Sequence, residues 1–183
     1  DGKLTQGSYK EGDTGDWQVI GNTTPRYQYG ITANMSYKNV YLNVFFQGIG
    51  KRDFWPSSQP FWPVATQYYN TQKWFVTDSW SEDNRDAYFA RPIARETKNQ
   101  QKQTKYLQDA SYCRLKNLQI GYTLPKTLVN KIGIQNCRVF VSGENLWTGT
   151  SLSKVFDPET ATGGYESYGN AYPLTSTWAF GLS

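Results

Sequence analysis

The sequence of 183 residues contains no histidine, the side chain that most often serves as a general base or a metal ligand near neutral pH. It also shows no Ser/His or Cys/His arrangement and no glycine-rich phosphate loop. Neighbouring carboxylates such as Glu82 and Asp83 are expected to be loop surface rather than an acid and base pair. The sequence therefore predicts no enzyme, no catalytic residues and no cofactor.

Long apolar runs are missing as well. No run of about 18 apolar residues occurs, which excludes a transmembrane helix. The mean hydropathy is −0.69, yet aromatic residues make up 16% of the chain. This pairing is typical of strands that alternate apolar and polar side chains between long hydrated loops. Because the chain opens on Asp1 and its first methionine is Met35, we expect a segment of a longer or processed protein.

The chain also lacks a strong excess of either positive or negative charge. The net charge of +4 is spread along the chain and does not favour a nucleic-acid partner. The most basic run, RETKNQQKQTK at 95–105, is expected to be a solvated loop, or else a contact with acidic lipid head groups or a partner. Asp1-Gly2-Lys3-Leu4 could end an oxygen-ligand calcium loop, but the other ligands are missing and no metal site is predicted.

What the sequence does contain is strand alternation, seen first in RYQYGITANMSYKNVYLNVFFQG at 26–48. A two-residue loop at Lys38 and Asn39 would pair apolar residues on one face and polar residues on the other. The apolar pairs are Tyr37 with Val40, Met35 with Leu42, Ala33 with Val44 and Ile31 with Phe46. The polar face pairs Ser36 with Tyr41, Asn34 with Asn43 and Gly30 with Gln47. A slip of one residue would mix the faces, so this register is predicted.

Three further strands are predicted at 111–124, 137–147 and within 173–183. In the first, Leu118, Ile120 and Tyr122 share the apolar face. The same parity carries Arg114 and Lys116, which we expect to face outward. Two cations on the core face of a soluble sandwich would be costly, whereas in a barrel they would lie beyond the hydrocarbon band, level with lipid phosphates. This placement favours a membrane barrel.

Long and short connections alternate along the chain. The long loops are 55–110 and 148–172, and the short connections are 38–39 and 125–136, the latter with one possible helical turn. Long loops on one side and short turns on the other are typical of outer-membrane barrels. The first long loop holds four tryptophans, expected mainly to pack the loop and proposed as contacts for substrate or a partner: Trp55, Trp62, Trp74 and Trp80.

The predicted fold class is all-β. In a membrane barrel, the apolar face would meet lipid and the polar face would line a lumen. The residues expected to face the lumen are Gln28, Asn34, Asn43, Gln47, Asn117 and Gln119. The alternative is a soluble, aromatic-rich, glycan-binding β-sandwich, in which a second sheet would cover the apolar face and the loop tryptophans would stack on sugar.

Four stretches resemble the C-terminal part of SusC/RagA-type TonB-dependent transporters of the outer membrane of Bacteroidetes. They are VIGNTTPRYQYGITANMSYKN at 19–39, DSWSEDNRDAYFARP at 78–92, YCRLKNLQIGYTLPKTLVNKIGI at 112–134 and RVFVSGENLWT at 138–148. The resemblance implies that residues 1–183 form the last five antiparallel strands of a transmembrane β-barrel of about 22 strands with a plugged lumen. The plug and earlier strands would lie upstream.

The resemblance also implies a location and partners. The intact protein would sit in the outer membrane of a Gram-negative bacterium and actively import oligosaccharides or peptides. A SusD-like surface lipoprotein would cover it, and TonB would engage a segment upstream of this chain. The long loops 55–110 and 148–172 would then be extracellular, and lipid would contact the apolar face.

The two cysteines are expected to be free thiols. Cys113 lies near the long-loop end of its strand, whereas Cys137 follows a short connection. At about 3.3 Å per residue, the strand between them separates the thiols by roughly 30 Å. A disulfide needs Cα atoms within about 7 Å.

Overall fold

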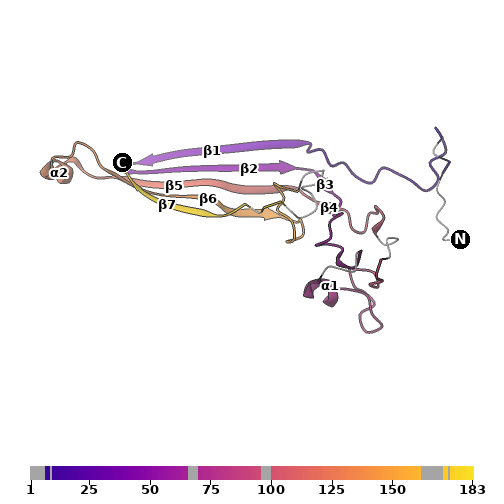
Figure 1. The fold of residues 1–183 in the computed structure, drawn as a ribbon. Helices are drawn as coiled ribbons and strands as arrows, with labels where there is room; N and C mark the ends of the chain where they lie inside the picture. Colours follow the sequence, from indigo (N-terminus) through magenta and orange to yellow (C-terminus); the bar gives the residue numbers. More distant parts are fainter. Residues whose placement is uncertain (1–6, 9, 66–69, 96–99, 162–170, 173) are drawn as a thin grey trace.

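A computed structural model describes residues 7–8, 10–65, 70–95, 100–161, 171–172 and 174–183. Five strands form one sheet in the order β1-β2-β5-β6-β7, and every neighbouring pair is antiparallel. The strand bounds are β1 Tyr27–Tyr37, β2 Val40–Gly50, β5 Tyr112–Thr123, β6 Arg138–Thr150 and β7 Thr177–Leu182. Figure 1 shows them as one long, narrow layer. The five predicted strands are confirmed.

The register of the first hairpin is the predicted one. Tyr37 pairs with Val40, and the pairing continues without a shift to Tyr27 and Gly50. Lys38 turns the chain with φ 54°, in the left-handed region that a non-glycine residue enters at a cost of about 1–2 kcal/mol. The hairpin register thus follows the side-chain pattern, although its turn lacks the favoured Asn-Gly sequence.

The two faces of the sheet differ in chemistry along their whole length. One, here named the apolar face, joins Tyr37, Val40, Tyr122, Val139 and Leu182 in a single row across the strands. Most of its side chains are exposed, Phe180 to 80%. No second layer of the described residues covers this face, since the only other sheet is the two-stranded pair β3 Asp53–Phe54 and β4 Gln108–Asp109. A soluble sandwich would bury it.

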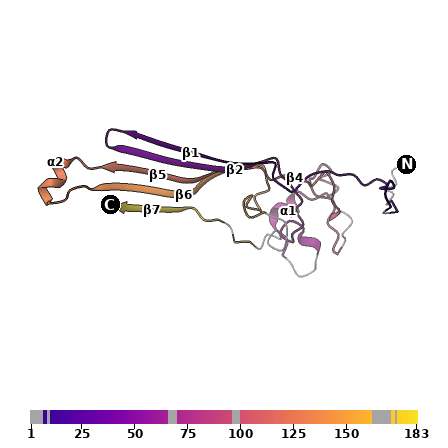
Figure 2. The same ribbon diagram turned by 90° about the horizontal axis from the view of Figure 1, so that it is seen from above.

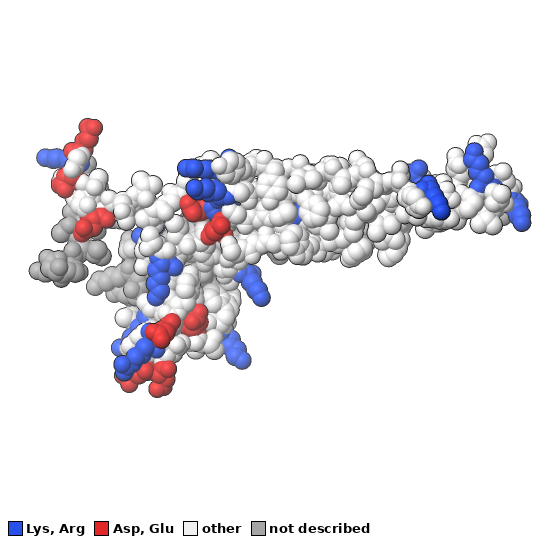
Figure 3. Space-filling model, turned by 180° about the vertical axis from the view of Figure 1, so that it is seen from behind, with Lys and Arg blue, Asp and Glu red and all other residues white. Residues whose placement is uncertain are grey.

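A band almost free of charge runs along the sheet. Strands β1, β2 and β7 contain no Lys, Arg, Asp or Glu. In Figure 3 the charged side chains gather at the two ends of the molecule and leave the sheet between them nearly white. Eleven strand residues extend about 36 Å, enough to cross a hydrocarbon core of about 30 Å when tilted. Within the described residues, no helix is long and apolar enough to cross a membrane.

One sequence prediction about the faces is wrong. Against β2, the pairing of β5 passes from Leu115–Phe46 directly to Asn117–Phe45, so Lys116 is an extra residue in a β-bulge. Against β6 the register also shifts here, and Lys116 lies opposite two unpaired residues, Asn145 and Leu146. An extra residue inverts the alternation beyond it. Leu115 and Leu118 therefore share the apolar face, whereas Arg114 shares the opposite, polar face with Asn117. Arg114 and Lys116 do not face outward at the level of lipid phosphates.

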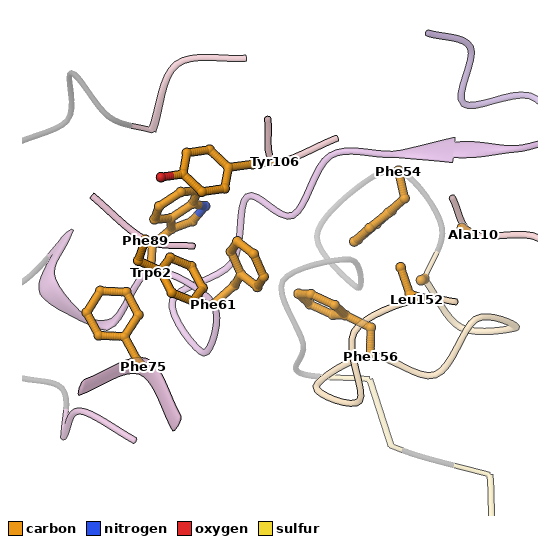
Figure 4. Packing of buried hydrophobic residues seen from close by; sticks show 10 residues of the cluster. Phe54, Phe61, Trp62, Phe75, Phe89, Tyr106, Ala110, Leu152 and Phe156 are labelled. Carbon is orange, nitrogen blue, oxygen red and sulfur yellow. The ribbon is translucent and has the colours of Figure 1, made fainter. Parts of the chain in front are cut away.

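The hydrophobic core lies in the loops rather than on the sheet. Ten buried residues form it: Phe54, Phe61, Trp62, Phe75, Phe89, Tyr106, Ala110, Leu152, Phe156 and Ala161. The two long loops meet there, because Phe156 of the second loop contacts Phe54 at 5.1 Å and Phe61 at 6.1 Å between ring centroids. Figure 4 shows these rings turned toward one another. We name this unit, residues 53–65, 70–95, 100–110 and 151–161, the loop cap.

The loop cap contains little regular structure. Its helical turns include η1 Pro63–Ala65 and α1 Lys73–Thr77. Two further helical elements, α2 Lys126–Val129 and η3 Asn130–Ile132, lie in the short connection between β5 and β6. The predicted helical turn in this connection is confirmed. In Figures 1 and 2 the loop cap and the N-terminal stretch lie at one end of the sheet, with α2 and the C-terminus at the other.

Both cysteines are free, as predicted. Cys113 lies opposite Gly48 and Gly149 near the loop cap, whereas Cys137 precedes β6 at the far end of the sheet. Alkylating the denatured protein without a reductant should add two labels per chain, measured as intact mass. A covalently linked 113–137 pair would contradict the strand layout.

Candidate functional site

The polar face brings together all six residues predicted to face a lumen. Asn34 lies opposite Asn43, and Asn43 in turn lies opposite Gln119, so three strands contribute to one row. The Asn43 side-chain amide donates a hydrogen bond to Gln119 Oε1 at 3.2 Å. Gln28, Gln47 and Asn117 share this face through the same pairings. Neutral amides thus make up much of this face, beside Glu144 opposite Asn117, and they can donate and accept hydrogen bonds.

Aromatic rings interrupt these amides, and their packing against glycines was not predicted from the sequence. Tyr41 lies flat against Gly121, where an added Cβ would come within 2.1 Å of the ring. Phe140 covers Gly181 in the same way, at 2.3 Å. The glycine opposite each ring gives it room to lie along the wall. An aromatic residue and a glycine at matching heights on neighbouring strands were the signal available in the sequence.

A groove of about 500 Å³ opens at the end of the polar face next to the loop cap. Its walls include Gln28 and Gln47 from the hairpin, Tyr112 from the start of β5 and Glu159 from the second long loop. Two of the six predicted residues therefore line a real hollow. The other four lie farther along the same face.

Arg114 ties the second long loop to the sheet. Its guanidinium donates to both carboxylate oxygens of Asp157 at 2.8 and 2.9 Å, and to Glu159 Oε2 at 2.8 Å. Its remaining nitrogen, Nε, donates to Thr148 Oγ1 at 2.8 Å. Lys116 of the bulge completes the group with Glu159 at 3.0 Å. Two cations thus meet two carboxylates, and the charges of this ionic clamp cancel.

Burial of Arg114 makes each hydrogen bond of the ionic clamp necessary. The Arg114 residue is only 3% exposed, so its charge needs every one of these acceptors. The β-bulge supplies the geometry, because without the extra residue Arg114 would point to the apolar face. The clamp fixes one wall of the groove, since Glu159 belongs to both.

A third cation holds the same loop segment. Arg52, buried between β2 and the loop cap, donates from Nη2 to the carbonyl oxygen of Pro158. Burial lowers the pKa of Arg52 from its ordinary value. Burial likewise raises the pKa of the Tyr88 phenol, which packs edge-on against Phe89 and Tyr106 in the loop cap. The loop cap is therefore a packed unit anchored to the sheet.

The four tryptophans of the first loop occupy different environments. Trp62 is 5% exposed, and its indole donates to the Pro56 carbonyl at 2.6 Å, so its ring is part of the core. Trp55 and Trp74 pack against the core from its edge. Trp80 is half-buried and lies outside the core residues. Trp55, Trp74 and Trp80 are all partly exposed, whereas Trp62 is not accessible to a ligand or partner.

Metal ligands do not gather in the part of the chain that the structure describes. No three His, Cys, Asp or Glu side chains there lie close enough to hold an ion. The Asp1-Gly2-Lys3-Leu4 stretch considered as part of a calcium loop lies outside the described residues.

Comparison with known proteins identifies the class. No family model matches the sequence. The chain is 32% identical, over 93% of its length, to TonB-dependent receptor P3 of Formosa agariphila. It is 25% identical to TonB-dependent receptor P26 of the same organism, again over 93% of the chain. It spans 17% and 18% of the length of these relatives.

Solved structures give the same answer. The RagAB peptide importer in its closed-closed state aligns with a TM-score of 0.68 and 27% identity, over 93% of this chain and 18% of the solved chain. The open-open state aligns with a TM-score of 0.63 and 24% identity, which shows the fold. The chain is thus similar in sequence to TonB-dependent receptors and has the fold of a segment of the RagA-type outer-membrane β-barrel. The predicted resemblance, fold class and outer-membrane location are confirmed.

Replacing Arg114 tests the ionic clamp. Arg114→Met should leave Asp157 and Glu159 without their main partner and cost about 3 kcal/mol. Hydrogen exchange of residues 151–161 in the intact protein should accelerate, while β1 and β2 stay protected. The triple change Arg114→Met, Asp157→Asn, Glu159→Gln should exchange more slowly than the single variant, because it removes both carboxylates and leaves only the charge of Lys116, whose side chain is 22% exposed. Equal exchange in all three proteins would refute the clamp.

Replacing Trp62 tests the core of the loop cap. Trp62→Ala should remove the centre of the aromatic cluster and destabilise the loop cap by about 3–5 kcal/mol. Protease cleavage within 55–110 should increase, whereas the folded barrel should still resist unfolding in detergent on an unheated gel. Val76→Ala, at an exposed site of the same loop, is the control and should change neither measurement.

Proposed function

We propose that the intact protein is an active importer of the outer membrane that takes up oligosaccharides or peptides with the help of TonB. The observation that carries this proposal is the two-faced sheet, whose uncovered apolar face spans the length of a membrane strand and whose polar face is lined with neutral amides. The similarity to TonB-dependent receptors and to the RagAB peptide importer supports it.

The orientation follows from strand direction. If β7 runs toward the periplasm, then β6 runs outward, β5 inward, β2 outward and β1 inward. The short connections 38–39 and 125–136 are then periplasmic, and the long loops 55–110 and 148–172 are extracellular. The loop cap is in this orientation part of the outer vestibule, where a SusD-like lipoprotein docks as a lid. Trp55, Trp74 and Trp80 are the partly exposed tryptophans that can contact lid or cargo.

The chemistry of the groove bears on the cargo. Gln28 and Gln47 offer amide donors and acceptors, and the clamp cancels the charge of Glu159 against Arg114 and Lys116. A neutral, hydrogen-bonding wall suits hydroxyl groups of oligosaccharides and peptide backbones equally. It offers no net charge to select acidic or basic cargo.

A gene deletion tests the proposed activity. A strain without the gene should lose growth on, and uptake of, at least one oligosaccharide or peptide mixture supplied as the sole carbon source. Restoring the intact gene should restore uptake, and removing TonB should abolish it. Unchanged growth on every cargo of both classes would contradict an importer.

Point variants test the groove. The double change Gln28→Leu, Gln47→Leu should lower uptake at subsaturating cargo by roughly tenfold or more, since each lost hydrogen bond is worth about 1 kcal/mol and the remaining polar groups stay unpaired. Gln135→Leu, at an exposed site on the short connection, is the matched control and should transport normally. Equal uptake by both variants would contradict a role of the groove in transport.

A further inference from the structure

The charged side chains at the short-connection end of the sheet are all positive. Lys38 turns the first hairpin, and Lys126 and Lys131 lie in α2 and η3; all three are exposed. No Asp or Glu occurs in residues 27–52 or 110–143, which hold the strand ends and both short connections. These lysines therefore have no carboxylate partner at this end of the described structure.

Apolar side chains stand among these lysines. Leu128 of α2 is 56% exposed and Ile134 is 42% exposed, although both lie in a short connection. Val129, between them, is buried and holds the segment in place. Beside this segment, the apolar face ends in the row from Tyr37 to Leu182. Exposed apolar side chains thus occur both on the sheet and in the short connection at this end.

Arg138 is the exception at this end. It lies opposite Thr123 on the polar face, and its guanidinium stacks over the Tyr41 ring at 4.8 Å from the centroid. Lys38, by contrast, extends its Nζ over Tyr37, the first residue of the apolar row, at 5.3 Å. The Lys38 charge is thus held at the edge of the apolar face, and the Arg138 charge is not.

We propose that Lys38, Lys126 and Lys131 bind the phosphates of anionic phospholipids in the adjacent leaflet, with Leu128 and Ile134 seated at the boundary between head groups and acyl chains. This inference rests on the proposed membrane barrel and adds a lipid site to it. Lysine stems lie along apolar surface while their ammonium groups reach the polar layer. A surface segment that exposes both lysines and large apolar residues suits a membrane interface.

A protein partner fits this end less well. It would have to cover two exposed apolar side chains at the very edge of a lipid-facing surface, and it would compete with the bilayer there. Anionic head groups meet the lysines and acyl chains meet Leu128 and Ile134 without any further component. The lipid occupant matches both chemistries at once.

Lipid titration of the intact transporter in detergent tests the proposal. Native mass spectrometry should show phosphatidylglycerol binding to the wild type more tightly than phosphatidylcholine. Each lysine near an anionic surface contributes about a fivefold change in affinity, so Lys38→Gln, Lys126→Gln, Lys131→Gln together should weaken phosphatidylglycerol binding at least tenfold. Phosphatidylcholine binding should not change.

The matched control removes three exposed lysines at the opposite end, with Lys10→Gln, Lys73→Gln and Lys102→Gln. It should keep wild-type phosphatidylglycerol affinity. An unchanged affinity in the first triple variant, or an equal loss in the control, would overturn the proposal. A protein that forms no barrel in vesicles would instead contradict the proposed function, so the two failures are distinct.

Depth measurement tests the apolar part. In the intact transporter with Cys113 and Cys137 replaced by serine, a spin label at Leu128→Cys in phosphatidylglycerol-containing vesicles should collide with oxygen more than with a water-soluble nickel complex. A label at Asn130→Cys, an exposed polar site of the same segment, should show the reverse preference. Water-like behaviour at both sites would refute the interfacial placement.

Discussion

The period of two along each strand governs this chain. Successive side chains point to opposite faces, so a register that places one apolar residue toward lipid places the whole apolar set there. The first hairpin satisfies this constraint over eleven consecutive pairs. Its consequence is a sheet with no core of its own, in which one face stays uncovered and the other stays polar. Such a sheet is stable only where lipid surrounds its apolar face and water its polar face.

The β-bulge at Lys116 interrupts the period of two, and this interruption has a structural consequence. One extra residue moves Arg114 from the lipid side to the polar side, where Asp157 and Glu159 accept its hydrogen bonds. The ionic clamp then joins the strand to the second long loop, and Phe156, one residue earlier, joins that loop to the aromatic core of the first. A single bulge thus links the wall of the barrel to the loop cap above it.

Features that depend on local alternation of side chains could be predicted from the sequence. Features that depend on contacts between distant segments could not. The hairpin register, the five strands and the shared face of Gln28, Asn34 and Gln119 follow from side-chain parity. The bulge left no such mark, because LKN reads as ordinary alternation until the neighbouring strands fix the pairing. The clamp was invisible for the same reason, since Asp157 and Glu159 lie more than forty residues from Arg114. Trp62 shows the same limit, because only the folded loop shows that its indole lies in the core.

The central claim is that the apolar face meets lipid while the polar face does not. The most direct measurement places single cysteines at residues 31 to 36 of β1 in the intact protein, with Cys113 and Cys137 replaced by serine, and labels each with a fluorophore. In vesicles containing lipids with quenchers on their acyl chains, we expect strong quenching at positions 31, 33 and 35 and weak quenching at 32, 34 and 36. Equal quenching at all six positions, or the opposite alternation, would contradict the account.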